Sequence, residues 1–396
     1  MKRLMIVIAL ASAVSYGSVV IVHGGNAPTP PSAAPLILPP EIVPQPDGSC
    51  LAYPVGDPTK SELHPLFGAY AGPAGYRVTR DLANVQTAVM YFPQVTLKTT
   101  NLAGMPTAFH FGTVDYASLP PSSFGLPDVT VMITKDVIVE GEQDSPYGRA
   151  VIVGGSACFA VYPNQALYYD TGGPTPFRLR TASGSGRSQC YFRIPDQDTL
   201  PAVTIRHLDS QQASLDFILL KAASSAIIDD VRITNMDKPW ENQAGTPFGG
   251  KWLFPIEIVP GSVVAFPQEH IQNVAISHCL LSPNTTSINT VGILVQTSAG
   301  TLNFANNSIE ASYVGIAFLN SPAAIATIQN NDISITPSTA PPVSGAPSCG
   351  IGLGNGNNAT VRENTVRGTG SRGLVLKGTL NTFENIDMRE FDAKDT

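Results

Sequence analysis

The chain of 396 residues carries 23 Lys and Arg against 30 Asp and Glu, a formal net charge of −7 at pH 7. This balance excludes nucleic acid and other polyanions as expected partners, because like charges repel and no Lys/Arg cluster offsets them. Charged residues make up only 13% of the chain and Gly and Pro are frequent, which favours an extracellular β protein over a helical enzyme.

The N-terminus has the pattern of an export signal. Met1-Lys2-Arg3 precede an uncharged apolar run from Leu4 to Val22. The run is also close to the length that spans a bilayer, so residues 1–27 are expected to be a signal peptide or an N-terminal anchor. Residues 28–48 are rich in proline and are expected to form an extended linker. The protein is therefore expected to be secreted, periplasmic or on the cell surface, with membrane contact only through an uncleaved N-terminal segment.

The cysteine count is odd, which leaves at least one thiol free or paired between chains in an exported protein. The five cysteines are Cys50, Cys158, Cys190, Cys279 and Cys349. A bridge between Cys158 and Cys190 stays open, whereas Cys279 is expected to be a small buried hydrophobe. The sequence holds no CxxC, and we expect no metal site and no cofactor.

Residues 49–125 lack the repeat that fills the rest of the chain. They are rich in Tyr, Pro and Phe, with a short helix expected near residues 80–89. We expect this stretch to be an N-terminal cap region, because an open strand edge at the end of a repeat protein would invite aggregation.

Residues 126–396 repeat themselves. Gly292, Gly315, Gly350 and Gly373 each precede an Ile or Leu and step by 23, 35 and 23 residues. Similar short runs of alternating apolar and polar residues extend backwards to residue 129, and each ends at Gly, Asn, Asp or Ser. Stacked coils of such strands bury a core that one coil cannot bury alone. The sequence predicts an all-β fold, a single-stranded right-handed parallel β-helix of about seven coils with an N-terminal cap region.

Asparagines recur beside one turn of the repeat. In a stack of coils, identical amides lie about 4.8 Å apart and can pair with their neighbours. The proposed ladder comprises Asn307, Asn331, Asn364 and Asn385. We expect it to satisfy backbone groups at a buried turn rather than to bind a ligand.

The Gly-Ile/Leu and Asn-x-Ile/Val repeats resemble those of the pectin-lyase-like superfamily over residues 129–388. The resemblance implies a right-handed β-helix, and its members include polysaccharide enzymes and adhesins. Polygalacturonases carry Asn-Thr-Asp, Asp-Asp, Gly-His-Gly and Arg-Ile-Lys motifs, of which only Asp229-Asp230 is present. The acidic calcium cluster and arginine motif of pectate lyases are absent as well, so the resemblance points to a fold rather than to an activity.

One column of the repeat holds ionisable residues in the early coils. His207, Asp230 and His278 occupy the positions that Asn306, Asn330, Glu363 and Glu384 hold later. Strand spacing would place neighbours in this column about 5 Å apart, and a His beside a carboxylate can act as a general base. We therefore take His207, Asp230 and His278 as candidate catalytic residues. The alternative is a solvated face without chemistry.

Candidate substrate-binding residues lie beside this column. They are Arg206, Arg232, Trp240 and Trp252. Both tryptophans fall in one insert, and an exposed aromatic ring can stack on a sugar. The other interpretation is that the tryptophans pin a long loop onto the solenoid.

Two hypotheses of function follow. The first is an exported β-helix protein that binds or processes carbohydrate on its early coils, with a polysaccharide or cell-surface glycan as partner. If it is an enzyme, it would be a polysaccharide lyase or glycoside hydrolase, and the sequence leaves open whether it catalyses anything. The second is a non-enzymatic surface, adhesion or scaffold protein, which the missing catalytic motifs favour.

Overall fold

The computed structural model consists of stacked strands. It describes residues 6–7, 20–21, 37–57, 59–63, 77–112, 130–155, 158–161, 167–168, 191–192, 200–214, 216–236, 240–242, 250–260, 270–283, 288–296, 299–319, 321, 323–336, 348–354, 358–368, 372–376 and 382–389. Within these residues, no helix is both long and apolar enough to cross a membrane. Cys190 and most of the expected signal segment lie outside them.

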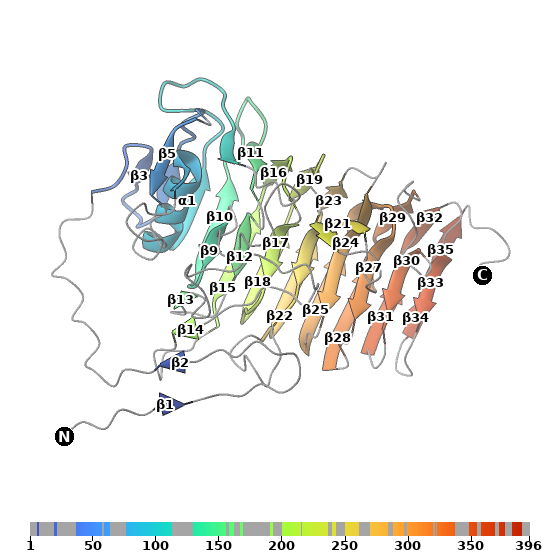
Figure 1. Cartoon of the computed structure of the whole chain (residues 1–396). Helices are drawn as coiled ribbons and strands as arrows, with labels where there is room; N and C mark the ends of the chain where they lie inside the picture. The colour runs from blue at the N-terminus through green and yellow to red at the C-terminus, as the bar shows by residue number, and fades with distance from the viewer. Residues whose placement is uncertain are drawn as a thin grey trace.

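Three parallel sheets run the length of the molecule (Figure 1). Sheet 1 contains, in spatial order, β3 (Ile42–Pro44), β4 (Cys50–Ala52), β7 (Gln94–Leu97), β10 (Val137–Gly141), β15 (Ala202–Arg206), β18 (Ser225–Asp229), β22 (Asn273–Ser277), β25 (Ala299–Ala305), β28 (Ala323–Gln329), β31 (Asn358–Arg362) and β34 (Thr382–Glu384). Its pairs are parallel except β3 with β4, which is antiparallel.

Sheets 2 and 3 follow sheet 1 in every coil. Sheet 2 contains β8 (Phe109–Gly112), β11 (Ala150–Gly154), β16 (Leu208–Gln211), β19 (Arg232–Thr234), β23 (Leu280–Ser282), β26 (Ser308–Ala311), β29 (Asp332–Ile335), β32 (Thr365–Gly368) and β35 (Asp387–Arg389). Sheet 3 contains β9 (Val131–Ile133), β12 (Phe159–Val161), β17 (Asp216–Leu220), β21 (Gly250–Ile258), β24 (Asn289–Gln296), β27 (Val314–Leu319), β30 (Cys349–Leu353) and β33 (Arg372–Leu376), with β20 (Trp240–Asn242) antiparallel to β21.

The remaining strands form small antiparallel pairs. They are β1 (Ile6–Val7) with β2 (Val20–Ile21), β5 (Ser61–Leu63) with β6 (Arg77–Thr79), and β13 (Leu167–Tyr168) with β14 (Tyr191–Phe192).

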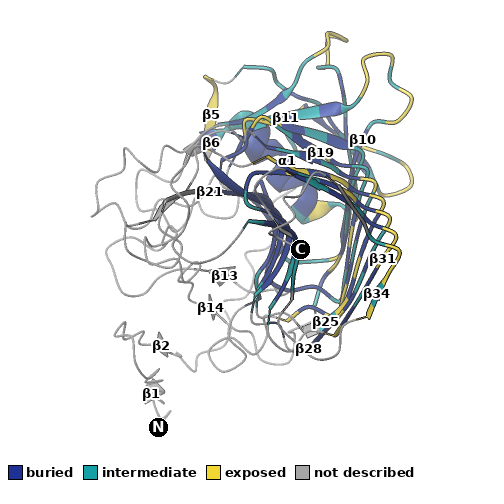
Figure 2. Cartoon of the chain, turned by 90° about the vertical axis from the view of Figure 1, so that its right-hand side faces the viewer, coloured by how far each residue is buried: buried dark blue, intermediate teal, exposed yellow. Residues whose placement is uncertain are grey.

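Taken in chain order, one strand from each sheet makes a coil. The described strands form eight complete coils, from β7-β8-β9 to β31-β32-β33, and then β34 and β35. This confirms the predicted right-handed parallel β-helix with an N-terminal cap region. Seen down the stack, buried strands enclose the centre while exposed residues line the outer edge of the turns (Figure 2).

The first coil begins at Gln94, earlier than the boundary at residue 126 that the repeat indicated. Long connections separate β7, β8 and β9, so their spacing does not match the later repeat. The expected linker also contributes structure, because β3 pairs with β4 and Ile42 is buried. Pro44 is tolerated there since β3 is an edge strand.

The repeated glycines lie where neighbouring coils touch. A Cβ on Gly315 would stand 2.6 Å from the carbonyl oxygen of Gly350 and would also strike Ile333. Gly292 has the same relation to Gly315 and Ile309, and Gly350 has it to Gly373 and Val366. The glycine of one coil therefore makes room for the β-branched residue of the next, which explains the period seen in the sequence.

The asparagine ladder forms with three members, all buried: Asn307, Asn331 and Asn364. The side-chain amide of Asn307 donates to Asn331 Oδ1 (2.9 Å), and that of Asn331 donates to Asn364 Oδ1 (2.8 Å). Each Oδ1 also accepts a backbone N–H from the preceding coil, beginning with that of Cys279 on Asn307 (3.0 Å). The ladder thus pairs buried polar groups that would otherwise lack partners.

The prediction that Asn385 belongs to the ladder is wrong. Register pairs Arg362 with Glu384 and Val366 with Met388, so Asn385 aligns with Glu363 and Ile386 aligns with Asn364. Glu384 likewise falls one position before the column assigned to it. The apolar residue follows Asn385 directly instead of two positions later, and a one-residue shift exchanges the two faces of a strand.

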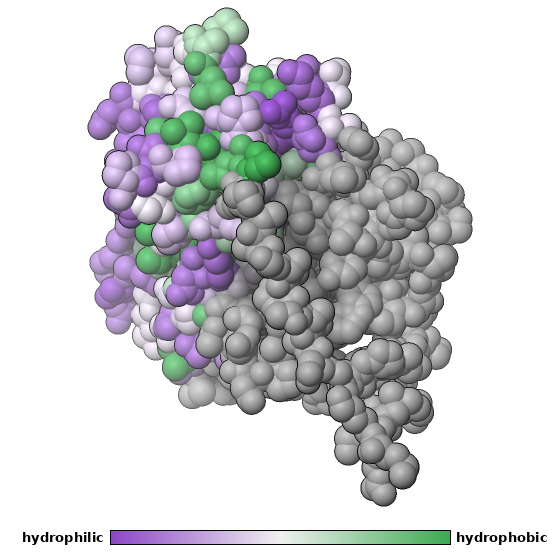
Figure 3. Space-filling view, turned by 90° about the vertical axis from the view of Figure 1, so that its left-hand side faces the viewer, coloured by the Kyte–Doolittle hydropathy of each residue, from purple (hydrophilic) through white to green (hydrophobic). Residues whose placement is uncertain are grey.

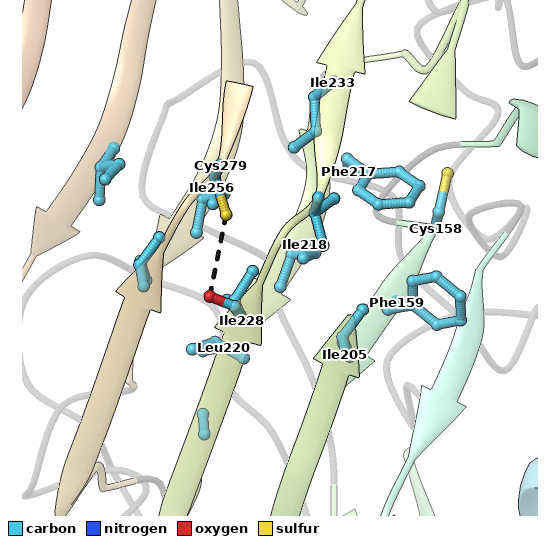
Figure 4. Close-up of a cluster of buried hydrophobic side chains, with 14 of the residues drawn as sticks. Cys158, Phe159, Ile205, Phe217, Ile218, Leu220, Ile228, Ile233, Ile256 and Cys279 are labelled. Atoms are coloured by element: carbon cyan, nitrogen blue, oxygen red, sulfur yellow. Dashed lines mark hydrogen bonds between the residues drawn. The ribbon is translucent and has the colours of Figure 1, made fainter. Parts of the chain in front are cut away.

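The core between the three sheets is one continuous cluster. Figure 4 shows its part in the early coils, where Phe159 and Phe217 pack edge to face at 5.6 Å. Cys279 is buried there as predicted, and burial raises the pKa of its thiol to about 12. Cys50, Cys158 and Cys349 are also buried.

The N-terminal end is covered by α1 (Arg80–Tyr91), which confirms the expected short helix. Thr79 caps it by accepting the N–H of Leu82 (3.3 Å), and its buried face joins the core. The side-chain amide of Gln86 donates to the carbonyl of Met132 (3.0 Å) and accepts its N–H (2.7 Å), which occupies the open edge of β9. On the described part of this end, hydrophobic residues gather centrally among hydrophilic ones (Figure 3).

Candidate functional site

The candidate residues lie at the corner between sheets 1 and 2, here called the first corner. There the chain turns through one residue in the left-handed region, with φ of 58° at His207 and 53° at both Asp230 and His278. The N–H of each donates to a carbonyl of the next coil, as from Asp230 to Ser277 (3.0 Å). Asn and Asp adopt this conformation most readily and His is also enriched in it, so the turn accepts all three side chains.

His207 and Asp230 are in direct contact. The Nδ1 atom of His207 lies 2.8 Å from Asp230 Oδ2, across adjacent coils. Among the described residues, Nε2 of His207 has no hydrogen-bond partner, and the side chain is 27% exposed. The pair is thus an Asp–His dyad whose second ring nitrogen is available to a ligand.

Arg149 fixes this dyad from a loop that sequence reasoning did not single out. Its guanidinium donates to Asp230 Oδ1 and to the Asp230 carbonyl, each at 2.5 Å, and lies 3.8 Å from Asp209 Oδ1. Burial raises the pKa of Asp230, but hydrogen bonds from Arg149 and His207 outweigh it and hold the pKa below its usual value. Asp230 therefore stays ionised and is unsuited to donate a proton.

Asp209 shifts the other way. Burial raises its pKa, although the charges of Arg149 and Arg232 partly offset this effect. Arg232 is its cross-strand neighbour on β19 and is exposed. The predicted residue Arg232 thus lies two positions beyond the turn residue Asp230 and next to Asp209.

Asp229 forms a second dyad, directed to the following coil. Its Oδ1 accepts from Ser277 Oγ (2.7 Å) and lies 2.8 Å from His278 Nδ1. The His278 side chain is 59% exposed, more than those of His207, Asp229 and Asp230. Asp229 ends β18 and Asp230 is the turn residue. The Asp230 carboxylate reaches back to His207 and the Asp229 carboxylate reaches forward to His278, so the two are held toward different coils.

Arg206 extends the site toward the N-terminal coils. Its Nε donates to Glu140 Oε2 (2.8 Å), and Gln94 donates to the other oxygen of that carboxylate (2.7 Å). We call the resulting surface the ridge. It comprises Glu140, Arg149, Arg206, His207, Asp209, Asp229, Asp230, Arg232 and His278.

The tryptophans do not belong to the ridge. Trp252 is only 1% exposed, stacks on Phe254 with ring centroids 6.0 Å apart, and meets Tyr313 edge to face at 5.0 Å. It belongs to a second apolar cluster, formed by residues of sheet 3. Its predicted role in stacking on sugar is therefore wrong. Trp240 pairs with it through the β20–β21 backbone, and its side chain lies outside what the structure describes.

The structure places His207, Asp230 and His278 in one column, with Arg206 and Arg232 beside them, and adds Arg149, Glu140 and Asp209. Arg149 and Glu140 lie outside the column that the repeat marked, so only the fold could bring them in. No group of three or more His, Cys, Asp or Glu in the described part of the chain is arranged to hold a metal ion.

Comparisons with known proteins add little. No family model matches the chain, and no curated protein matches it. Among solved structures, the crystal structure of PfbA, a surface adhesin of Streptococcus pneumoniae, is 11% identical, with a TM-score of 0.33 and coverage of 78% of this chain and 89% of that chain. The fold assignment therefore rests on the strand pairing of this chain itself.

Proposed function

We propose that this is an exported β-helix protein that binds carbohydrate on the ridge without cleaving it. The observation that carries the proposal is that the carboxylates are already engaged by fixed partners: Asp230 by Arg149 and His207, and Asp229 by Ser277 and His278. Glycoside cleavage needs two carboxyl groups that face the same bond, one of them able to donate a proton. The ridge offers fixed hydrogen-bonding groups instead.

A glycan suits these groups. Sugar hydroxyls both donate and accept, and the exposed parts of His278, Arg206 and Asp229 offer both functions on a firm scaffold. Arg206 is held by Glu140, and His278 is held by Asp229. These side chains therefore lose little further conformational freedom on binding. The net charge of −7 argues against polyanionic partners.

Membership of the pectin-lyase-like superfamily and export are parts of this proposal. The first is supported by the Gly-Ile and Asn repeats, and the second by the apolar N-terminal run and the low charge content. A polysaccharide lyase or glycoside hydrolase activity on the ridge is disfavoured by the paired carboxylates.

The second candidate is a scaffold or adhesion protein without a glycan site. It is favoured by the burial of Trp252, which removes the aromatic platform expected from the sequence. In that case the ridge serves only to fasten coils together.

A glycan array and a polysaccharide-degradation panel on the purified mature chain test the proposal. We expect binding without release of reducing ends or unsaturated products. The double variant His207→Ala/His278→Ala should lose binding at least tenfold, whereas Asn303→Ala, on the exposed face of β25, should bind normally. Product release would assign an enzyme, and a blank array would leave the scaffold candidate.

A further inference from the structure

We propose that the ligand of the ridge is a neutral glycan, and that one of its sugar rings stacks on Tyr147. This inference rests on the proposed function and names the ligand class and a residue that the sequence did not indicate. Two independent features carry it, the charge balance of the ridge and the loop that holds Tyr147.

Two of the three arginines of the ridge are already in ion pairs, and the third lies beside a carboxylate. Arg206 lies 2.6 Å from Glu140, Arg149 lies 2.5 Å from Asp230, and Arg232 is the cross-strand neighbour of Asp209. Asp229 adds a further negative charge, and its side chain is hydrogen-bonded to Ser277 and His278. The ridge therefore carries four carboxyl groups and three guanidinium groups. A uronate would have to displace a fixed carboxylate to reach Arg149 or Arg206, and at the exposed Arg232 it would meet the charge of Asp209. Neutral hydroxyls can add to the existing pairs instead.

Tyr147 is an exposed aromatic residue on a firmly held loop. It is 54% exposed, and its N–H donates to Ser145 Oγ (3.2 Å). Ser145 Oγ also bonds Thr99 Oγ1 (2.6 Å), and Gly148 N–H donates to the Ser145 carbonyl (3.1 Å). The start of the loop is fixed by Glu142, which pairs with Lys98 and accepts from Thr99.

The same loop reaches the ridge. Arg149 follows Tyr147 by two residues, so their Cα atoms are at most about 7 Å apart. The Arg149 side chain is bound to Asp230, which places the end of the loop beside the His207–Asp230 dyad. The loop belongs to the first corner of the second coil, one coil before His207. The Tyr147 ring can stack on one sugar of the glycan while hydroxyl groups of the glycan hydrogen-bond to His207 and Arg206.

Calorimetry with two sets of oligosaccharides tests the inference. The probes are neutral gluco- and galacto-oligosaccharides and, in parallel, oligogalacturonates of the same length at pH 7. We expect the neutral set to bind and the acidic set to bind at least tenfold more weakly. Tyr147→Ala should weaken neutral binding about tenfold, whereas Tyr147→Phe, which keeps the ring, should stay within about threefold. Ile325→Ala, at a similarly exposed position (55%), is the matched control and should change nothing.

Other outcomes separate this inference from the function it rests on. Stronger binding of oligogalacturonates, lost in His207→Ala/His278→Ala, would overturn the neutral ligand and leave glycan binding on the ridge intact. Neutral binding that Tyr147→Ala leaves unchanged would overturn the stacking role. Binding of neither set would remove both the inference and the proposed function. Circular dichroism of each variant shows that the fold is retained.

Discussion

The first corner has the same backbone conformation in the early and the late coils, but the side chains at this corner differ between the two halves of the stack. Left-handed residues with φ between 53° and 58° turn the chain in both halves. The inner side differs, since Leu208, Val231 and Cys279 fill it early and Asn307, Asn331 and Asn364 fill it late. The outer side differs as well, with His207, Asp230 and His278 early and Asn306, Asn330 and Glu363 late. Backbone conformation therefore does not dictate either side chain, and the outer position is free to vary once the inner side is satisfied.

Breaking the ladder in its middle should have the largest effect. Asn331→Ala removes the acceptor of both the backbone N–H and the side-chain amide of Asn307, and it removes the donor to Asn364. Because unsatisfied buried polar groups each cost about 1–3 kcal/mol, we expect the free energy of unfolding to fall by about 3 kcal/mol. Urea unfolding followed by tryptophan fluorescence measures this. Asn303→Ala on the exposed face is the control, and an equal loss in both variants would show that the ladder contributes nothing.

Removing the Arg149 side chain from the early half should lower the free energy of unfolding by a smaller amount. Arg149→Ala removes two bonds to Asp230 but leaves the one to His207, so we expect a loss of about 1 kcal/mol near pH 6. The low pKa of Asp230 means that its ionised form contributes stability above about pH 4, a contribution lost as the pH falls. The gap between wild type and variant should accordingly narrow toward pH 3. A gap that does not depend on pH would contradict the role of Arg149 as the partner of this carboxylate.

Replacing Cys279, the last early residue on the inner side of the corner, by Asn should have the smallest effect on stability. The Sγ of Cys279 lies 3.8 Å from the Ile228 carbonyl, the place where the ladder amides donate, as Asn307 does to Ile276 (2.9 Å). Cys279→Asn should therefore extend the ladder by one coil and change stability by less than about 1 kcal/mol, even though a buried amide without partners would cost more. Ile276→Asn, in the neighbouring buried column, is the control and should lose several times as much. A comparable loss in both variants would mean that the ladder cannot grow.

The fold could be predicted because the same packing contacts and hydrogen bonds recur in successive coils. Gly315 and Gly350 mark the same contact in successive coils, and Asn331 and Asn364 mark the same turn, so each coil supports the interpretation of the next. The error at Asn385 arose where the spacing to the apolar residue shortened by one. The start at Gln94 was missed because the first coils have long connections, which hide a period set by strand stacking.

The site was predicted only in part for the same reason. His207, Asp230 and His278 occupy one repeat position, so the period alone placed them together. Arg149 lies in an irregular loop and contacts Asp230 across 81 residues, which no local pattern encodes. Trp252 was misassigned because composition cannot tell an aromatic residue that packs on Phe254 from one that faces solvent.

The helix at the N-terminal end has a consequence for how the molecule behaves in a crowded solution. Asp81 accepts the N–H of His110 on β8 (2.8 Å), and Gln86 pairs both backbone groups of Met132 on β9. Two side chains, five positions apart on α1, thus occupy hydrogen-bonding sites that an incoming strand from another molecule would need. A stack of parallel strands is a template for fibre growth, and this chain blocks that growth at one end with a carboxylate and an amide.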